Sequence, residues 1–477
     1  MPFRAYRVAT FTRCSQHRFS ISLTFSSLPQ YQPHLSPQSQ ILHNFLPWLE
    51  KKASSTISSS LSIANSSYGN SLFTSNSIQT GDCILQVPYS VQITADNLPP
   101  EITTLIGEDV GNIAKLATVL LIHKNFGQDS EWHPYISCLP PQGKMHNTIF
   151  WNESELEMIH GSSVYQETVY HKSQIEKDFL AIRPVLKSFC QSFGDFTCKD
   201  FMHACTLVGS RAWGGTKGLS LIPFADFLNH DGISEAIVMS DDDKQCSEVT
   251  ADRDYVPGEQ VLIRYGKFSN ATLMLDFGFT IPHNIYDQVQ IQLDIPKHDP
   301  LHGMKLDLLQ QYFVPQANDA KSLKCSVNSF TIKFALILNF MFILMNNLAT
   351  KYLISIASPF NQHLACPMTP ELRISVVKLQ YLDHLVTEAG QTDGRLARRP
   401  LQDMNKEIQA HQMLSSLFIR LIEERNTTLM SLDSRDSSSL CERLPVRKQM
   451  AQDLLHGELR ILKSASAWLE NYCFSLT

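Results

Sequence analysis

A chain of 477 residues is too long for one ordinary hydrophobic core, and its 43% apolar and 18% charged residues exclude a fibrous or disordered protein. The formal net charge is −6 and no run of Lys and Arg alternates with aromatic residues, which argues against nucleic-acid binding. The 11 cysteines form no C-x-x-C pair and show no metal-ligand spacing, so we expect reduced, packed cysteines and no metal site.

The first 40 residues differ in composition from the rest of the chain. No Asp or Glu occurs before residue 50, whereas Arg4, Arg7, Arg13 and Arg18 lie among many Ser and Thr residues. Such a composition is typical of an organelle transit peptide, and it lacks the apolar core of a secretory signal. We therefore expect residues 1–40 to be a transit peptide, for a chloroplast rather than a mitochondrion. A disordered tail on a cytoplasmic protein is the alternative.

Strand and helix patterns alternate along the following residues. The Ser-rich residues 53–67 predict a flexible surface segment, and the apolar run after them predicts a strand that ends at Pro88. Residues 110–200 have helical spacing, strands return at 260–265 and from Val289 to Ile295, and helical stripes occupy the chain beyond 300. A sheet-rich core with a helical insert and a helical C-terminal part predicts an α+β fold.

Residues 334–357 form the most apolar stretch of the chain. They contain no acidic residue and would be long enough to cross a bilayer. Polar residues interrupt the stretch, among them Asn339, Asn346, Asn347 and Lys351, and polar groups are costly in hydrocarbon. We expect a buried helix of the C-terminal part here, with a membrane anchor as the alternative.

The segment Leu219 to His230 carries the most informative polar residues. Its apolar run contains Asp226 and ends in Asn229 and His230, so three polar side chains are expected where a buried segment ends. Taken alone, Asn-His is a common turn pair.

This segment resembles the [L/I]-x-P-x-x-D-x-x-N-H signature of the Rubisco large-subunit methyltransferase-like branch of the SET-domain family. Other stretches resemble motifs of the same family, in the family's order: Trp132 to Pro140, Phe150-Trp151, Ser210-Arg211, Pro257 to Gly266, Ser269 to Leu273, Asp393 to Leu396 and Asn405 to His411. Together they extend from about residue 40 to 475. So many motifs in the correct order are not expected by chance.

The resemblance implies a knotted, β-rich SET domain at 41–297 with a helical insert at about 100–205. It also implies an all-α substrate-binding domain at 298–477. The expected transit peptide at 1–40 precedes both domains. Its implied cofactor is S-adenosylmethionine, and its implied partner is a protein substrate. We expect a monomer that binds neither nucleic acid nor membrane.

The resemblance also assigns site residues. Cofactor contacts fall on Tyr68, Gly69, Asn70, Arg211, Asn229, His230 and Phe277. Substrate contacts fall on Arg211 and Asp226. A guanidinium suits the carboxylate of the cofactor, and backbone groups at Asn229-His230 suit its amine and adenine edge. The alternatives are a structural ion pair between Arg211 and Asp226, and a loop-stabilising hydrogen bond for Asn229.

Two residues depart from the family pattern. Phe277 stands where lysine-modifying relatives have a tyrosine, so its ring lacks the hydroxyl, and Ser71 stands where a second glycine is expected. The remaining tyrosine of this region is Tyr265, which aligns with an acceptor-contacting tyrosine of the actin-histidine branch. We therefore expect Tyr265 to be the catalytic residue, with a core-facing tyrosine as the alternative.

The function that follows is an S-adenosylmethionine-dependent protein N-methyltransferase, with lysine as the expected acceptor. Phe277 keeps two alternatives open, namely methylation of another nitrogen such as that of histidine, and a SET scaffold that binds proteins without transferring methyl groups.

Overall fold

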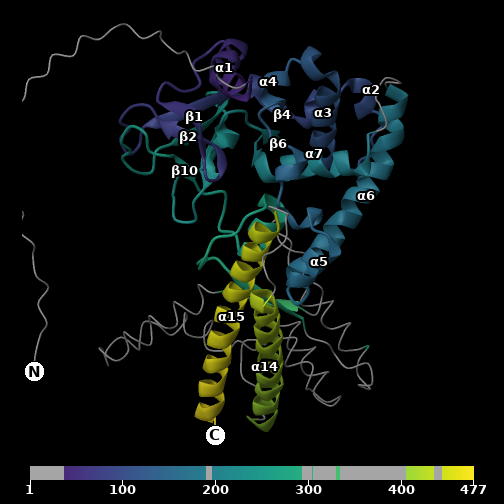
Figure 1. Ribbon diagram of the computed structural model, residues 1–477, viewed down its shortest axis with the longest axis vertical. Helices are drawn as coiled ribbons and strands as arrows, with labels where there is room; N and C mark the ends of the chain where they lie inside the picture. Colours follow the sequence, from purple (N-terminus) through teal and green to yellow (C-terminus); the bar gives the residue numbers. More distant parts are fainter. Residues whose placement is uncertain are drawn as a thin grey trace, which may run out of the picture.

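Short strands from distant parts of the chain pair with one another in the computed structural model, which describes residues 37–189, 196–216, 218–292, 303, 329–333, 404–434 and 443–476. The strands form small antiparallel sheets. One pairs β1 (Leu61–Ser66) with β2 (Gly69–Thr74). In a second, β9 (Cys246–Thr250) lies between β3 (Cys83–Pro88) and β8 (Val238–Asp241), and in a third, β6 (Gly218–Leu221) lies between β4 (Ile93–Thr94) and β5 (Ala212–Gly215). This β-rich part lies beside the helical insert (Figure 1). The predicted α+β class is confirmed.

The prediction of a flexible segment at 53–67 is wrong. Residues 61–66 form strand β1, and Ile57 and Leu61 are buried in the core. Ser58 is also buried, and its hydroxyl donates a hydrogen bond to the Ile84 carbonyl at 2.6 Å. The serine-rich composition led to the wrong prediction, although Ile57 and Leu61 are buried. Composition does not show which hydroxyl groups form hydrogen bonds with the backbone.

The helical insert lies between strands β4 and β5 of the chain. It consists of α2 (Pro100–Thr103), α3 (Asn112–Phe126), α4 (His133–Ile136), α5 (Glu153–Leu156), α6 (Ser163–Phe189) and α7 (Cys198–Arg211), and α1 (Pro37–Ala53) precedes the strands. Helix α7 begins with a capping box, in which Thr197 Oγ1 accepts from the Asp200 amide and the Asp200 carboxylate accepts from the Thr197 amide. The helix ends at Arg211, directly before β5.

Two long helices, α14 (Met404–Ser434) and α15 (Arg443–Leu476), lie side by side below the sheet-rich part (Figure 1). Val289 and Ile291 of β11 (Gln288–Gln292) are buried against this helix pair, as their alternation predicted. The partner of β11 is β12 (Ser329–Lys333), a strand within the part that was predicted to be all helical. That prediction needs this correction, because a strand's pairing partner is not visible in its own sequence.

Buried ion pairs and a hydrogen bond join the two C-terminal helices to each other and to the insert. Arg447 of α15 pairs with Glu155 of α5 at 2.6 Å, and Arg425 of α14 pairs with Glu458 of α15 at 3.0 Å. Glu458 also accepts a hydrogen bond from Ser162 of the insert. All four charged side chains are at most 7% exposed, so each charge depends on its partner.

Several predictions fall outside the described residues. These are the transit peptide at 1–40 except for the first turn of α1, the apolar stretch 334–357, the motif 393–396 and the strand residues Leu293 and Ile295. In the described part of the chain, no helix combines the length and the apolar character needed to span a membrane. The same part contains no group of three His, Cys, Asp or Glu side chains arranged to hold a metal ion.

Candidate active site

The Asn-His segment follows a tight turn and forms a short parallel strand pair. After β6 the chain makes a tight turn, where fully buried Phe224 has a φ of +77°. The segment then pairs in parallel, as β7 (Asn229–His230), with β10 (Leu262–Ile263). A positive φ is unfavourable for a residue with a bulky side chain, so packing must hold it. Asp226, Asn229 and His230 therefore lie in the short stretch between this turn and the end of β7.

Tyr265 lies at the centre of an aromatic cluster. Its ring stacks on the His230 ring, with 5.1 Å between the ring centroids, and lies edge-on to the Trp213 ring at a centroid distance of 5.6 Å. The Phe277 ring packs against it at a centroid distance of 5.2 Å. The Tyr265 hydroxyl donates a hydrogen bond to the Leu228 carbonyl at 2.6 Å. Burial raises the pKa of Tyr265, which keeps the hydroxyl protonated.

His230 is held as a neutral imidazole. The backbone N–H of Tyr265 donates to His230 Nδ1 at 3.1 Å, so this nitrogen is an acceptor and the ring proton belongs on Nε2. Burial lowers the pKa of His230 and thereby opposes protonation. The structure therefore brings the predicted cofactor residue His230 into contact with the predicted catalytic residue Tyr265.

Phe277 is positioned by the glycine that follows it. It ends a π-helical turn, Leu273–Phe277, after α8 (Asn270–Thr272), and Gly278 adopts a φ of +79°. A Cβ at Gly278 would lie 2.7 Å from Asn147 Oδ1 and 2.9 Å from the Asn147 backbone nitrogen. Only glycine fits this position, and the reversal of the chain presents the Phe277 ring to Tyr265.

A buried carboxyl group lies beside the cluster. Tyr135 of α4 donates a hydrogen bond to Asp226 Oδ2 at 2.8 Å, whereas Asp226 Oδ1 is buried without a hydrogen-bond partner in the described part of the chain. Burial raises the pKa of Asp226 to about 6, although the charge of Arg211 and the Tyr135 hydrogen bond oppose the rise. Arg211 itself donates to Ser210 Oγ at 2.9 Å. Its positive charge therefore acts on Asp226 from the end of α7.

Tyr135 was not among the predicted site residues. The sequence contained a signal for it, because it lies in the family-like stretch from Trp132 to Pro140. Its partner Asp226 is 91 residues away along the chain. No local pattern could pair them.

The β1–β2 hairpin supplies the other side of the site. Asn229 Nδ2 donates to Ser71 Oγ at 2.7 Å, and the Ser71 and Ser66 hydroxyls lie 2.7 Å apart. Asn229 thus makes the loop-stabilising bond that was its alternative role, and this bond ties the Asn-His segment to the turn at Gly69. Ser71 is fully buried, so the substituted glycine position is integrated into the fold.

The remaining predicted residues of the hairpin have different surroundings. Gly69 has a φ of +91°, and no atom lies within 4 Å of the place where its Cβ would stand. Asn70 Nδ2 donates to the Cys138 carbonyl at 3.5 Å. The Tyr68 side chain is 72% exposed, and the structure does not bring it to the aromatic cluster.

Ser71 allows a direct test of the link between hairpin and segment. We expect Ser71→Ala to lower the free energy of unfolding by about 1–3 kcal/mol, because Asn229 Nδ2 loses its acceptor. Urea unfolding followed by circular dichroism measures this loss. Ser67→Ala is the matched control, because Ser67 is an exposed serine of the same hairpin. Equal effects of the two substitutions would contradict a role for the Ser71 hydroxyl.

Comparisons with known proteins show which proteins this chain resembles. The family model "SET domain" matches residues 69–266. The Rubisco large-subunit N-methyltransferase of Pisum sativum, described as chloroplastic, is 28% identical over 58% of this chain and 59% of its own length. The actin-histidine N-methyltransferase of Dasypus novemcinctus is 26% identical over 50% of this chain and 43% of its own length. The chain thus spans less than two thirds of either relative.

The likeness of the fold extends further than the likeness of the sequence. The SET domain of LSMT, solved with lysine and AdoHcy bound, superposes with a TM-score of 0.68 at 21% identity and covers 93% of both chains. At that identity the likeness concerns the fold. Residues 69–266 of this chain match the SET domain, and its fold is similar to that of the solved SET domain of LSMT.

Proposed function

We propose that this chain is an S-adenosylmethionine-dependent protein N-methyltransferase, with a lysine side chain as its acceptor. One observation carries the proposal: the Asn229-His230 segment is bonded to the hairpin through Ser71 on one side and stacked on Tyr265 on the other. A cofactor site and an acceptor site would therefore adjoin along one short segment. The related SET domain bound to lysine and AdoHcy supports this division.

The residues on the hairpin side fit the cofactor. The turn at Tyr68, Gly69 and Asn70 is open beside Gly69, so a ligand can approach the backbone there. The Arg211 guanidinium would bind a carboxylate, and the backbone of Asn229-His230 would bind amine and adenine groups. The Phe277 ring would cover this site from the other side. When bound, S-adenosylmethionine supplies an electrophilic methyl group on a sulfonium.

The residues on the other side suit a nitrogen acceptor. A lysine has a pKa of about 10.4, so its neutral form costs about 4 kcal/mol near neutral pH. Desolvation among the rings of Tyr265, Trp213 and Phe277 would reduce that cost. The Tyr265 hydroxyl donates its hydrogen bond to the Leu228 carbonyl, so its oxygen can still accept a hydrogen bond from the amine. Asp226 Oδ1 would accept a second hydrogen bond.

A histidine acceptor is the second candidate, and Phe277 favours it. The tyrosine hydroxyl expected at this position in lysine-modifying relatives is missing, and one relative is named for actin histidine. A neutral imidazole is the major form near neutral pH and needs no deprotonation. Tyr265 would orient either acceptor.

The proposal extends to the whole chain. We assign a SET domain to 41–297, with its helical insert at about 100–205, and a substrate-binding domain to 298–477. We also propose that the protein is a monomer located in the chloroplast, and the description of the Pisum sativum relative as chloroplastic supports this location. A fluorescent protein fused behind residues 1–60 tests the location, and cytoplasmic fluorescence would contradict it.

Transfer of a tritiated methyl group tests the function. The purified chain is incubated with labelled S-adenosylmethionine and one of three acceptors: recombinant Rubisco large subunit, actin or desalted chloroplast stroma. Label on a lysine, located by mass spectrometry, is expected. Label on a histidine would establish the second candidate instead. Binding of S-adenosylhomocysteine without transfer to any acceptor would overturn the enzymatic proposal and indicate a scaffold.

A further inference from the structure

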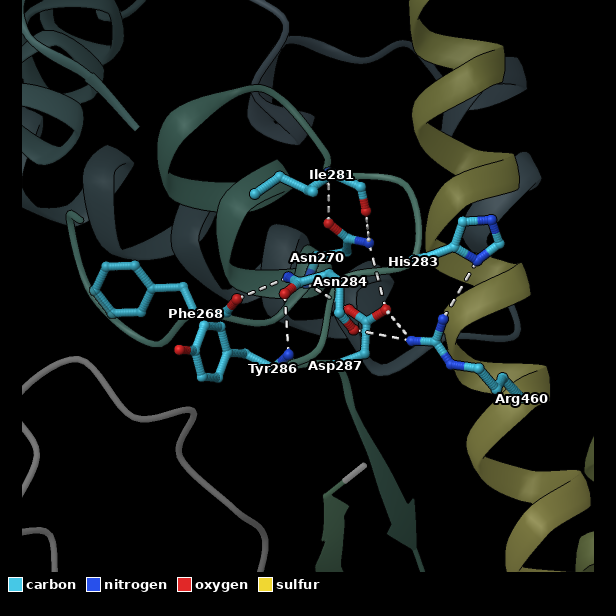
Figure 2. A network of polar contacts seen from close by, with 8 residues as sticks. All are labelled: Phe268, Asn270, Ile281, His283, Asn284, Tyr286, Asp287 and Arg460. Carbon is cyan, nitrogen blue, oxygen red and sulfur yellow. Dashed lines mark hydrogen bonds and ion pairs between the residues drawn. The ribbon is translucent and has the colours of Figure 1, made fainter. Parts of the chain in front are cut away.

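A buried polar network holds the segment 268–287, which follows Tyr265 in the chain (Figure 2). Asn270 is fully buried, and its backbone N–H donates to Asp287 Oδ1 at 2.9 Å. Its side-chain amide closes the loop by donating to the Ile281 carbonyl at 2.9 Å and accepting from the Ile281 amide at 2.8 Å. Asn284 Nδ2 donates to the Phe268 carbonyl at 2.8 Å. The first and last parts of the segment are thereby fixed to each other.

Helix α15 completes this network from the C-terminal part of the chain. Arg460 Nη2 donates to the Asn284 carbonyl at 2.8 Å and lies 3.4 Å from Asp287 Oδ2 (Figure 2). One turn earlier, Gly457 lets the Asp287 carboxylate approach the helix, because a Cβ there would clash with Oδ2 and lie 2.9 Å from Cγ. Asp453, a further turn earlier, accepts a hydrogen bond from Thr280 Oγ1 at 2.7 Å. Three positions on one face of α15 therefore contact the segment.

The same segment carries the aromatic wall of the candidate site. The Phe268 and Phe277 rings lie 5.5 Å apart, and Phe277 packs on Tyr265. Phe279 lies 5.9 Å from His230. Displacement of the segment would move these rings relative to Tyr265. The contacts of α15 are thus connected to the acceptor side through a chain of bonded groups.

We propose that Asp287 and Arg460 are positioning residues of the methyl-transfer site, through which α15 sets the place of the Phe268 and Phe277 rings beside Tyr265. This inference rests on the proposed function and assigns to the C-terminal helix a part in building the acceptor site. The physical reason is that Asp287 is 4% exposed and must keep all its donors. Burial raises the pKa of its carboxyl to about 7, and the charge of Arg460 opposes the rise. A partly satisfied buried network is costly, so its members move together or not at all.

Gly457→Ala in the full-length protein tests the inference. In an ordinary helix this change is stabilising by up to about 1 kcal/mol. Here we expect amide exchange across 268–286 to increase and the single-turnover methyl-transfer rate to fall at least about tenfold, a larger change than that in S-adenosylhomocysteine affinity. Gly209→Ala in α7 is the matched control, because no atom lies within 4 Å of its Cβ position.

Two further variants separate positioning from general damage. Arg460→Gln should reproduce both effects at a temperature where the protein stays folded. Adding Asp287→Ala to the Gly457→Ala variant should lower the methyl-transfer rate little further than Gly457→Ala alone, because both changes break the same network. Unchanged exchange and rate in Gly457→Ala would overturn the inference. If the wild type transfers no methyl group, the proposed function fails, and the exchange measurement alone decides whether α15 positions the segment.

Discussion

Arg447→Ala is expected to lower the free energy of unfolding by about 3–5 kcal/mol. Arg447 Nη1 lies 2.6 Å from Glu155 Oε2, and the two side chains are 3% and 7% exposed. The guanidinium also donates to the carbonyls of Phe150 and Met145, both at 3.2 Å. Its removal would leave the Glu155 charge and two carbonyl groups without these donors between α15 and the insert. Urea unfolding followed by circular dichroism measures the loss.

A surface pair of the same C-terminal helices is the control. Arg420 and Glu424 lie 3.9 Å apart on α14 and are 66% and 50% exposed, so Arg420→Ala should cost less than about 1 kcal/mol. The double variant Arg447→Met with Glu155→Leu should recover most of the lost stability, because no unpaired charge remains buried. An Arg447→Ala variant no less stable than Arg420→Ala would show that the buried pair does not join the two parts.

Tyr265→Phe is expected to reduce the methyl-transfer rate about 100-fold, which corresponds to about 2.7 kcal/mol in the activation barrier. The substitution keeps the ring and its contacts with His230 and Trp213. It removes the hydroxyl that donates to the Leu228 carbonyl and that would orient the acceptor nitrogen. Single-turnover transfer of labelled methyl groups measures the effect.

Phe277→Tyr is the matched comparison. It adds a hydroxyl at the neighbouring ring, 5.2 Å from the Tyr265 ring centre, where lysine-modifying relatives are expected to have one. We expect this variant to retain activity and to shift preference toward lysine. A Tyr265→Phe rate within threefold of the wild-type rate would contradict the catalytic role of Tyr265, whichever acceptor is used.

Local patterns predicted much of the fold. The alternation at Val289 and Ile291 predicted strand β11, and the spacing of apolar residues in 110–200 predicted the helices of the insert. The motif with Asn229 and His230 predicted the segment on which the candidate site is built. These features depend on neighbours within one helix turn or one strand, so the sequence displays them directly.

Long-range partners could not be predicted in this way. Arg447 and Glu155 are separated by 292 positions, so no local pattern could pair them. The many serines of 53–67 indicated a surface segment, although Ser58 bonds to a strand 26 residues away. Pairing of β12 with β11 likewise depends on tertiary structure. Polar residues find such partners only when the chain folds, which composition and periodicity do not describe.

Calorimetric titration of the purified chain with S-adenosylhomocysteine tests the central claim most directly, namely that the Gly69 turn and the Asn229-His230 segment form one cofactor site. We predict saturable binding of one molecule per chain, with Ser71→Ala weakening it and Ser67→Ala leaving it unchanged. The absence of saturable heat up to a ligand concentration of about 1 mM would contradict the claim.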